Sequence, residues 1–191
     1  METMRLTTWI AAPEERCFGL ATCAEFHGVL AKGREGTASH ETVHGQLNSE
    51  DRLVWPGHTA GLQVKYTTRI EALRPPNYFR EVLDQGCFQH FEHHHHFTFL
   101  NDGTRMRDEL RFSLPPGPQC LITIPLLRRY LASRIGMRNQ ILKMVAETEM
   151  WKSYLPQAAS QQEDPTPGPS SIRKRARSAN LPAGQMAAHR G

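Results

Sequence analysis

Hydrophobic residues alternate with a period of two through the middle of the chain and follow a helical period on either side. Residues 4–10 are rich in β-branched and aromatic types and predict a strand. Pro13 fits the first turn of a following helix, and Glu14 and Glu15 suit its positive end. A second short helix is predicted from about residue 24 to residue 31.

Between residues 37 and 114, strand-like segments are separated by short turn signals. These signals are Asn48-Ser49, Pro56-Gly57, Pro75-Pro76-Asn77, Gln85-Gly86 and Asn101-Asp102-Gly103. Short strands at this spacing, with no helices between them, predict an antiparallel meander. Because proline cannot donate to a ladder, Pro56 predicts a bulge, an edge position or a strand end at this point.

The helical period returns after the proline-rich run at residues 115–118. Five apolar residues lie along one stripe of a helix predicted to end near Trp151: Leu127, Leu131, Ile135, Leu142 and Val145. The basic residues of this segment, Arg138 among them, are expected mostly on other faces. One long amphipathic helix beside an antiparallel sheet indicates the α+β class.

The composition changes after Tyr154. Residues 156–191 are rich in Pro, Ser and Gln and are predicted to be disordered, which leaves residues 1–155 as one domain. This tail holds five basic and two acidic residues, so it carries three of the four net positive charges. The domain is therefore nearly neutral, and no nucleic-acid partner is indicated. The basic run at residues 173–177 allows an alternative in which the tail binds a partner.

The absence of recognisable targeting signals and the spacing of the cysteines predict a cytoplasmic location. The N-terminus lacks the apolar region of a signal peptide, and no apolar run reaches the roughly 18 residues of a membrane span. Four cysteines show no C-x-x-C spacing and are expected to be reduced and buried. The oligomeric state is left open.

The most unusual stretch is FQHFEHHHHFTFL, at residues 88–100, which contains four consecutive histidines. Side chains of a strand alternate between its faces, so the histidines form two pairs. His93 and His95 share a face with the phenylalanines and are predicted to point inward. His94 and His96 are predicted to point to solvent.

A second strand follows the turn at residues 101–103, and its apolar positions are all even-numbered. A two- or four-residue loop places Phe97 opposite Met106 and His95 opposite Asp108. A three-residue loop with a bulge would instead place His95 opposite Glu109. The apolar pattern favours the first register, because a slip by one residue would turn the apolar side chains outward.

Two inward imidazoles and a carboxylate leave three interpretations open. They form a polar cluster that orients the sheet, they bind the polar group of an otherwise apolar ligand, or they carry out chemistry. In the last case His95 and Asp108 are the candidate catalytic pair. Alternatively, His93 and His95 are two ligands of a metal that needs a third, from His58, Glu81 or Asp108. The sequence places none of these three near the pair, so neither a metal nor another cofactor is expected.

Several short motifs, taken in order over residues 4–153, resemble the SRPBCC (START-like, Bet v 1-like) superfamily. They include Gly86-x-Phe88-x-x-Phe91-x-His93-x-His95-x-Phe97, Asp102-Gly103-Thr104-x-Met106-x-Asp108, Leu114-Pro115-x-Gly117 and Arg138-Asn139-x-x-Leu142-Lys143. The resemblance is greatest to the polyketide cyclase/dehydrase-type ligand-binding branch. It implies a helix-grip fold, in which a curved antiparallel sheet wraps around a long C-terminal helix, with two short helices after the first strand.

The resemblance implies a cavity between sheet and helix that binds a small hydrophobic or amphipathic ligand. Its expected lining combines the inward residues of the strands with two residues of the helix: Trp55, Phe79, Phe91, His93, His95, Phe97, Met106, Asp108, Leu110, Leu131 and Ile135. The alternative functions are a cyclase or dehydratase that uses His95 and Asp108, and an interaction protein that acts through its tail.

Overall fold

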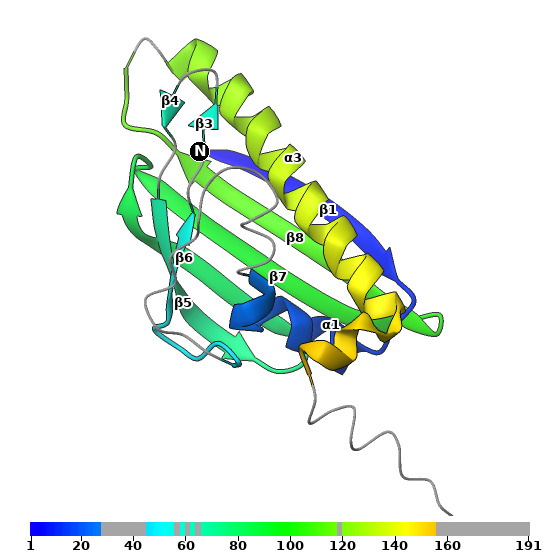
Figure 1. Ribbon diagram of the computed structural model, residues 1–191. Helices are drawn as coiled ribbons and strands as arrows, with labels where there is room; N and C mark the ends of the chain where they lie inside the picture. The colour runs from blue at the N-terminus through cyan, green and yellow to red at the C-terminus, as the bar shows by residue number, and fades with distance from the viewer. Residues whose placement is uncertain (28–44, 56–57, 60–61, 64–65, 118–119, 156–191) are drawn as a thin grey trace, which may run out of the picture.

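A six-stranded antiparallel sheet forms the body of the protein (Figure 1). The computed structural model describes residues 1–27, 45–55, 58–59, 62–63, 66–117 and 120–155. The order across the sheet is β1 (Glu2–Ile10), β8 (Gly103–Ser113), β7 (His90–Leu100), β6 (Tyr78–Gly86), β5 (Tyr66–Arg74) and β2 (Arg52–Trp55). A separate two-stranded sheet pairs β3 (His58–Thr59) with β4 (Leu62–Gln63). The predicted antiparallel meander is confirmed.

The helices cover one face of the sheet. Helix α1 (Glu14–Ala21) follows the first strand, and residues 24–27 are again helical. The remainder of the second predicted helix lies outside the described residues. Helix α3 (Cys120–Glu147) runs across the sheet beside β1 and β8, with α1 near its C-terminal end (Figure 1).

The C-terminal helix ends earlier than predicted. Thr148 has an extended backbone, which stops α3, and the 3-10 helix η1 (Glu149–Ser153) then carries Trp151 into the core. Leu155 is also buried, so the packed part of the chain continues to that residue. The predicted disorder of residues 156–191 lies outside the described residues and stays a prediction.

The hairpin of β7 and β8 has the predicted register. His95 pairs with Asp108, Phe97 with Met106, and Leu100 pairs next to the turn. Asn101 and Asp102 both have positive φ, at 50° and 58°, as a two-residue type I′ turn requires. The alternative with a three-residue loop is therefore wrong. Strand β2 ends at Trp55 and lies at an edge of the sheet, as Pro56 predicts.

Buried apolar side chains form two separate clusters between the sheet and the helices. The α1 cluster includes α1, η1 and the C-terminal half of α3: Ile10, Cys17, Phe18, Leu20, Phe79, Phe97, Met106, Leu142, Val145 and Trp151 are among its members. The Phe91 cluster consists of Met4, Phe88, Phe91, Leu110, Phe112, Leu127, Leu131 and Ile135. The five apolar residues of the predicted helix stripe are all buried, and they divide between the two clusters.

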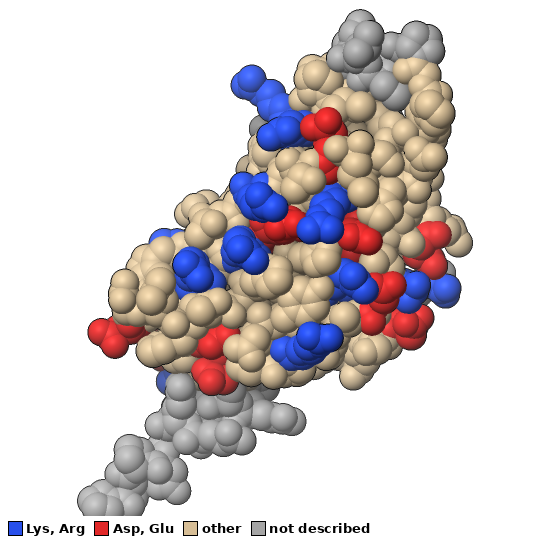
Figure 2. Space-filling view, turned by 180° about the vertical axis from the view of Figure 1, so that it is seen from behind, with Lys and Arg blue, Asp and Glu red and all other residues tan. Residues whose placement is uncertain are grey.

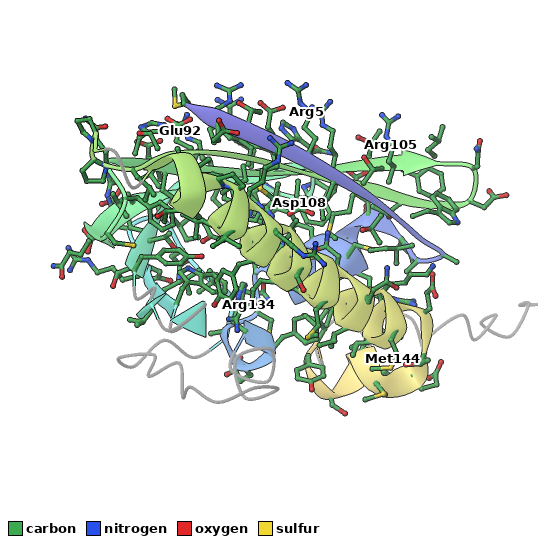
Figure 3. The ribbon with its side chains drawn as sticks, turned by 90° about the horizontal axis from the view of Figure 1, so that it is seen from above. Arg5, Glu92, Arg105, Asp108, Arg134 and Met144 are labelled. Atoms are coloured by element: carbon green, nitrogen blue, oxygen red, sulfur yellow. The ribbon has the colours of Figure 1, made fainter. Side chains whose placement is uncertain are left out.

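The opposite face of the sheet is polar. Figure 2 shows cationic and anionic side chains interspersed across it, and Figure 3 shows Arg5 and Arg105 projecting away from α3. Glu109 accepts hydrogen bonds from Arg5 at 2.9 Å and from Arg111 at 2.6 Å. The rings of His94 and His96 stack on this face, 6.3 Å apart, so the predicted division of the four histidines is confirmed.

The cysteines differ in burial. Cys17 and Cys23 are buried and free, as predicted, but Cys87 is exposed, because it lies just beyond the end of β6 rather than on an inward strand position.

None of the described helices is long and apolar enough to cross a membrane.

Candidate functional site

A band of polar side chains crosses the inner face of the sheet and lies between the two apolar clusters. We call these residues the polar band. Every strand of the sheet contributes to it, and α3 adds two residues: Thr8 (β1), Asp108 (β8), His93 and His95 (β7), Glu81 (β6), Thr68 (β5), Trp55 (β2), and Arg138 and Asn139 (α3).

The alternation of the strands explains the position of the band. On β7 the inward residues are, in order, Phe91, His93, His95 and Phe97, so the two histidines stand between members of the two clusters. On β8 Asp108 stands in the same way between a residue of the α1 cluster and one of the Phe91 cluster. The inward faces of β7 and β8 are thus apolar at both ends and polar in the middle, and these polar positions are adjacent from strand to strand.

Asp108 is the centre of the band and is fully buried. Its Oδ1 accepts a hydrogen bond from Nη2 of Arg138 at 2.6 Å, and it lies 3.0 Å from Nε2 of His93 and 2.9 Å from Nδ1 of His95. Its Oδ2 accepts from Nδ2 of Asn139 at 2.6 Å. Figure 3 shows Asp108 between the sheet and α3. Burial alone would raise the pKa of Asp108, but Arg138 and the two imidazoles outweigh burial and hold it well below its ordinary value.

His95 lies between two carboxylates. Its Nδ1 faces Asp108, and its Nε2 lies 3.2 Å from Oε1 of Glu81, although without the alignment of a hydrogen bond. The ring stacks on Phe79, with the centroids 4.0 Å apart and the planes inclined by 13°. Both the ring and the Glu81 carboxylate are almost completely buried. The orientation of His95 is therefore fixed by a cross-strand stack and by the two strands that flank β7.

The second carboxylate oxygen of Glu81, Oε2, is hydrogen-bonded to Thr68. Oε2 accepts a hydrogen bond of 2.8 Å from Oγ1 of Thr68, which in turn accepts one of 2.9 Å from the indole N–H of Trp55. Burial alone would raise the pKa of Glu81, but the adjacent His95 outweighs it and brings the pKa to about 2. Glu81 is therefore a second buried carboxylate.

His93 completes the centre. Burial and the neighbouring His95 lower its pKa to about 4, against the opposing effect of Asp108, so its imidazole is neutral at pH 7. The rings of His93 and His95 lie on the same face with their centroids 3.8 Å apart. The charged side chains of this centre are two carboxylates, Glu81 and Asp108, and one guanidinium, Arg138.

A buried ionic cluster is a poor explanation of stability. Apolar side chains of similar volume often stabilise a core equally well or better, whereas removing one ionic partner is strongly destabilising. Strongly shifted pKa values with a specific charged neighbour are typical of functional sites. Within the part of the chain that the structure describes, the polar band is therefore the candidate functional site.

The structure distributes the predicted lining residues over three places. His93, His95 and Asp108 lie in the polar band. Phe79, Phe97 and Met106 belong to the α1 cluster, against which Trp55 is partly buried, and Phe91, Leu110, Leu131 and Ile135 belong to the Phe91 cluster. Of the three possible third metal ligands, Glu81 and Asp108 lie beside the histidine pair. The side chain of His58 lies outside what the structure describes.

Arg138 is the main residue that sequence reasoning misplaced. It was expected on a face away from the apolar stripe, but it is buried, because its guanidinium pairs with Asp108. Its spacing contains the signal: Arg138 lies seven residues after Leu131 and four before Leu142, so it falls on the stripe itself. A cation at such a position indicates a buried anion on the facing sheet.

Several solved structures are similar to this chain. TTHA0849 from Thermus thermophilus has a TM-score of 0.62 at 20% identity, over 75% of this chain and 95% of that protein. The ZhuI aromatase/cyclase from Streptomyces sp. R1128 has a TM-score of 0.58 at 10% identity, over 75% and 94%. A START superfamily protein from Mycobacterium smegmatis has a TM-score of 0.51 at 19% identity, over 73% and 98%.

No protein-family model and no curated protein matches the chain. At these identities the similarity concerns the fold. The chain itself has a curved six-stranded sheet, a long C-terminal helix and short helices after the first strand. The chain therefore has the same helix-grip fold as these structures, with a curved antiparallel sheet packed against a long C-terminal helix.

Proposed function

We propose that the protein binds a small amphipathic molecule between the sheet and α3, with the polar group of the molecule at the polar band. The observation that carries this proposal is the buried cluster of Glu81, His93, His95, Asp108 and Arg138 between the two apolar clusters. Ligand sites are mostly apolar and contain a few precisely placed polar groups that orient the guest. Similarity to a START superfamily protein and to an aromatase/cyclase supports the same function.

The Phe91 cluster is the better candidate for the apolar part of the guest. The α1 cluster is packed against α1 and η1, which contribute Phe18, Leu20 and Trp151 to it. Partly exposed side chains border both clusters, four at the α1 cluster and six at the Phe91 cluster, where Tyr66, Leu83 and Tyr130 are among them. Such side chains can rearrange around a guest at lower cost than fully buried ones.

Tyr66 offers a hydrogen-bond donor beside the polar band. Its ring contacts both Phe88 and Phe91, at centroid distances of 5.1 and 4.9 Å. Burial and the negative charge of Glu81 raise the pKa of Tyr66, so the phenol keeps its proton at any physiological pH. A carbonyl or hydroxyl oxygen of the guest is therefore the expected partner.

The proposal is tested by native mass spectrometry on protein purified without detergent, and by titration with a fluorescent apolar probe. A matched pair of variants on α3 locates the site: Leu131→Phe fills space in the Phe91 cluster, and Leu142→Phe makes the same change in the α1 cluster. Both are buried, so each is expected to lose stability by about 1–3 kcal/mol through overpacking. Only Leu131→Phe is expected to weaken probe binding, by on the order of tenfold.

Two results would contradict this function. One is a protein that carries no copurified small molecule and binds no apolar probe. The other is an equal effect of Leu131→Phe and Leu142→Phe on probe affinity, which would mean that binding reflects general loosening of the core.

A second candidate function is acid/base catalysis of the cyclase or dehydratase type. The observation that favours it is the contact of His95 with carboxylates on both ring nitrogens, since a positioned imidazole is the commonest general base. Turnover of a conjugated polyketide-like substrate, lost in His95→Phe while probe affinity is retained, would establish catalysis. Binding without turnover supports the first candidate.

A further inference from the structure

The inner face of the sheet contains a set of three potential metal ligands. Glu81, His93 and His95 each offer one ligand atom, and these atoms lie within 4.8 Å of one another. All three residues are buried, and they come from adjacent positions of β6 and β7: Glu81 pairs directly with His93. Glu81 is one of the three candidate third ligands that the sequence could not place near the histidine pair.

Two of the ligand atoms lack hydrogen bonds within the described part of the chain. Among the residues that the structure describes, neither Oε1 of Glu81 nor Nε2 of His95 has a hydrogen-bond partner, although both are inaccessible to solvent. They face each other at 3.2 Å. A buried carboxylate oxygen at this distance from an imidazole nitrogen needs a positive centre between them, which is either a proton on Nε2 or a metal ion.

The remaining polar atoms of these residues are already engaged. Oε2 of Glu81 accepts from Thr68. Nδ1 of His95 and Nε2 of His93 lie 2.9 and 3.0 Å from Oδ1 of Asp108. Each ligand is thus held by a partner on its far side, as in metal sites where a carboxylate orients the coordinating histidines. Metal binding then requires the tautomers in which Nδ1 of His95 and Nε2 of His93 carry the protons and donate to Asp108, so that Nε2 of His95 and Nδ1 of His93 are the coordinating nitrogens.

We propose that Glu81, His93 and His95 bind a divalent first-row transition-metal ion. Two imidazoles and one carboxylate are a ligand set for zinc or ferrous iron, with the fourth position open to water or to an oxygen of a guest. Metal–ligand bonds of about 2.0–2.2 Å place tetrahedral ligands about 3.3 Å apart, close to the separation of Oε1 and Nε2.

The surrounding charges are compatible with a dication. Nη2 of Arg138 lies within hydrogen-bond distance of both Oδ1 of Asp108, at 2.6 Å, and Nδ1 of His95, at 3.1 Å. Metal binding at Nε2 of His95 requires that Nδ1 carries the proton, so Arg138 then donates to Asp108 alone. With neutral imidazoles, Glu81, Asp108 and Arg138 leave one negative charge, so a dication brings the site to one positive charge. An anionic fourth ligand, such as hydroxide or a carboxylate or enolate oxygen of a guest, would neutralise the site.

The test uses the full chain without a polyhistidine tag, stripped with a chelator and then titrated with Zn²⁺ by calorimetry. Metal content after gel filtration gives the stoichiometry. We expect one equivalent of zinc, a higher Tm with zinc than without it, and tetrahedral d–d absorption when Co²⁺ replaces Zn²⁺. The titration needs no guest, and probe binding can be measured in chelator, so this inference and the proposed function can fail separately.

Matched variants distinguish the inner site from the exposed histidines. The double variant His94→Ala/His96→Ala should keep the equivalent of zinc, and Glu81→Gln should lose it. If Glu81→Gln does not fold, Thr68→Val serves instead, because it keeps all three ligands and removes the hydroxyl that donates to Glu81 and accepts from Trp55. It should weaken zinc binding by about 10- to 100-fold. Absence of zinc uptake by the wild-type chain, or loss of zinc in the His94/His96 variant alone, would overturn the inference.

Discussion

Arg138 of α3 donates a hydrogen bond from Nη2 to Oδ1 of Asp108 on β8, across the interface between helix and sheet, at 2.6 Å. Both side chains are buried, at 9% and 0% exposure. This contact fixes the middle of the helix over the polar band. It also compensates the charge of Asp108, which is a condition for keeping a carboxylate in the interior.

Replacing Arg138 with Met keeps much of its apolar length and removes its charge. Asp108 then remains as an uncompensated buried anion, so we expect a loss of about 3–5 kcal/mol in the free energy of unfolding. Urea denaturation measures the loss. Adding Asp108→Asn to this variant should restore part of the stability, and a nearly neutral Arg138→Met would show that the pair is not coupled.

The two pairs of histidines should respond differently to substitution. His95→Phe or Asp108→Asn leaves buried partners unpaired and should cost on the order of 1–3 kcal/mol or more, whereas His94→Ala and His96→Ala on the outer face should be close to neutral. Replacing both His95 and Asp108 with apolar residues of similar size should cost less than the sum of the single changes. Thermal and urea unfolding of the five variants test this, and greater damage from the outer pair would be inconsistent with the assigned faces.

Glu109 gives a prediction for pH. Hydrogen bonds from Arg5 and Arg111 lower its pKa to about 2, from an ordinary value of 4.5, against a smaller effect of burial. A carboxyl group whose pKa is lower in the folded than in the unfolded state stabilises the fold at pH values above its unfolded pKa. This stabilisation is lost as the pH falls through the folded-state pKa. Glu109→Gln should therefore be less stable than the wild type at about pH 6, and the difference should shrink at about pH 3. A difference that stays constant would exclude the carboxylate as its source.

The thiols should differ in reactivity. Burial raises the pKa of Cys17 to about 11, which leaves almost no thiolate at neutral pH, whereas Cys87 is exposed. Limited alkylation followed by peptide mapping should label Cys87 before Cys17 and Cys23. Labelling of Cys17 in the folded protein at a similar rate would indicate that the end of the domain near α1 opens readily.

The tail should contribute little to folding. Leu155 packs in the α1 cluster, so the cut is placed after it. A chain that ends at residue 155 should unfold within about one degree of the full chain, because residues 156–191 have the composition of a disordered segment. A Tm lower by several degrees would mean that the tail docks on the domain.

The sequence predicts the fold well because its signals are local. Alternation determined which histidines face inward, and the apolar positions of β7 and β8 determined their register. The positions of Asn101 and Asp102 in a two-residue turn agree with that register. Such features depend on neighbours along one hairpin, so they can be read without knowing the remainder of the chain.

The composition of the site was harder to predict because its contacts join distant strands. Glu81 reaches His95 across β6 and β7, and Thr68 reaches Glu81 from β5 through strands with irregular register. Bulges between Thr67 and Thr68 and between Ile70 and Ala72 shift the pairing there, and no local pattern reveals them. The partner of Asp108 on α3 depends in addition on how the helix is rotated on the sheet.

The separation of the two apolar clusters has a consequence for how this protein can change. A substitution that enlarges or reduces the Phe91 cluster alters side chains that are packed independently of the α1 cluster, where α1, η1 and the end of α3 are anchored. The size of the side chains in one half can therefore change while the other half keeps the helices in place. If the Phe91 cluster receives the proposed guest, this arrangement allows different ligands on a constant scaffold, and the Phe91 cluster is the target for redesigning specificity.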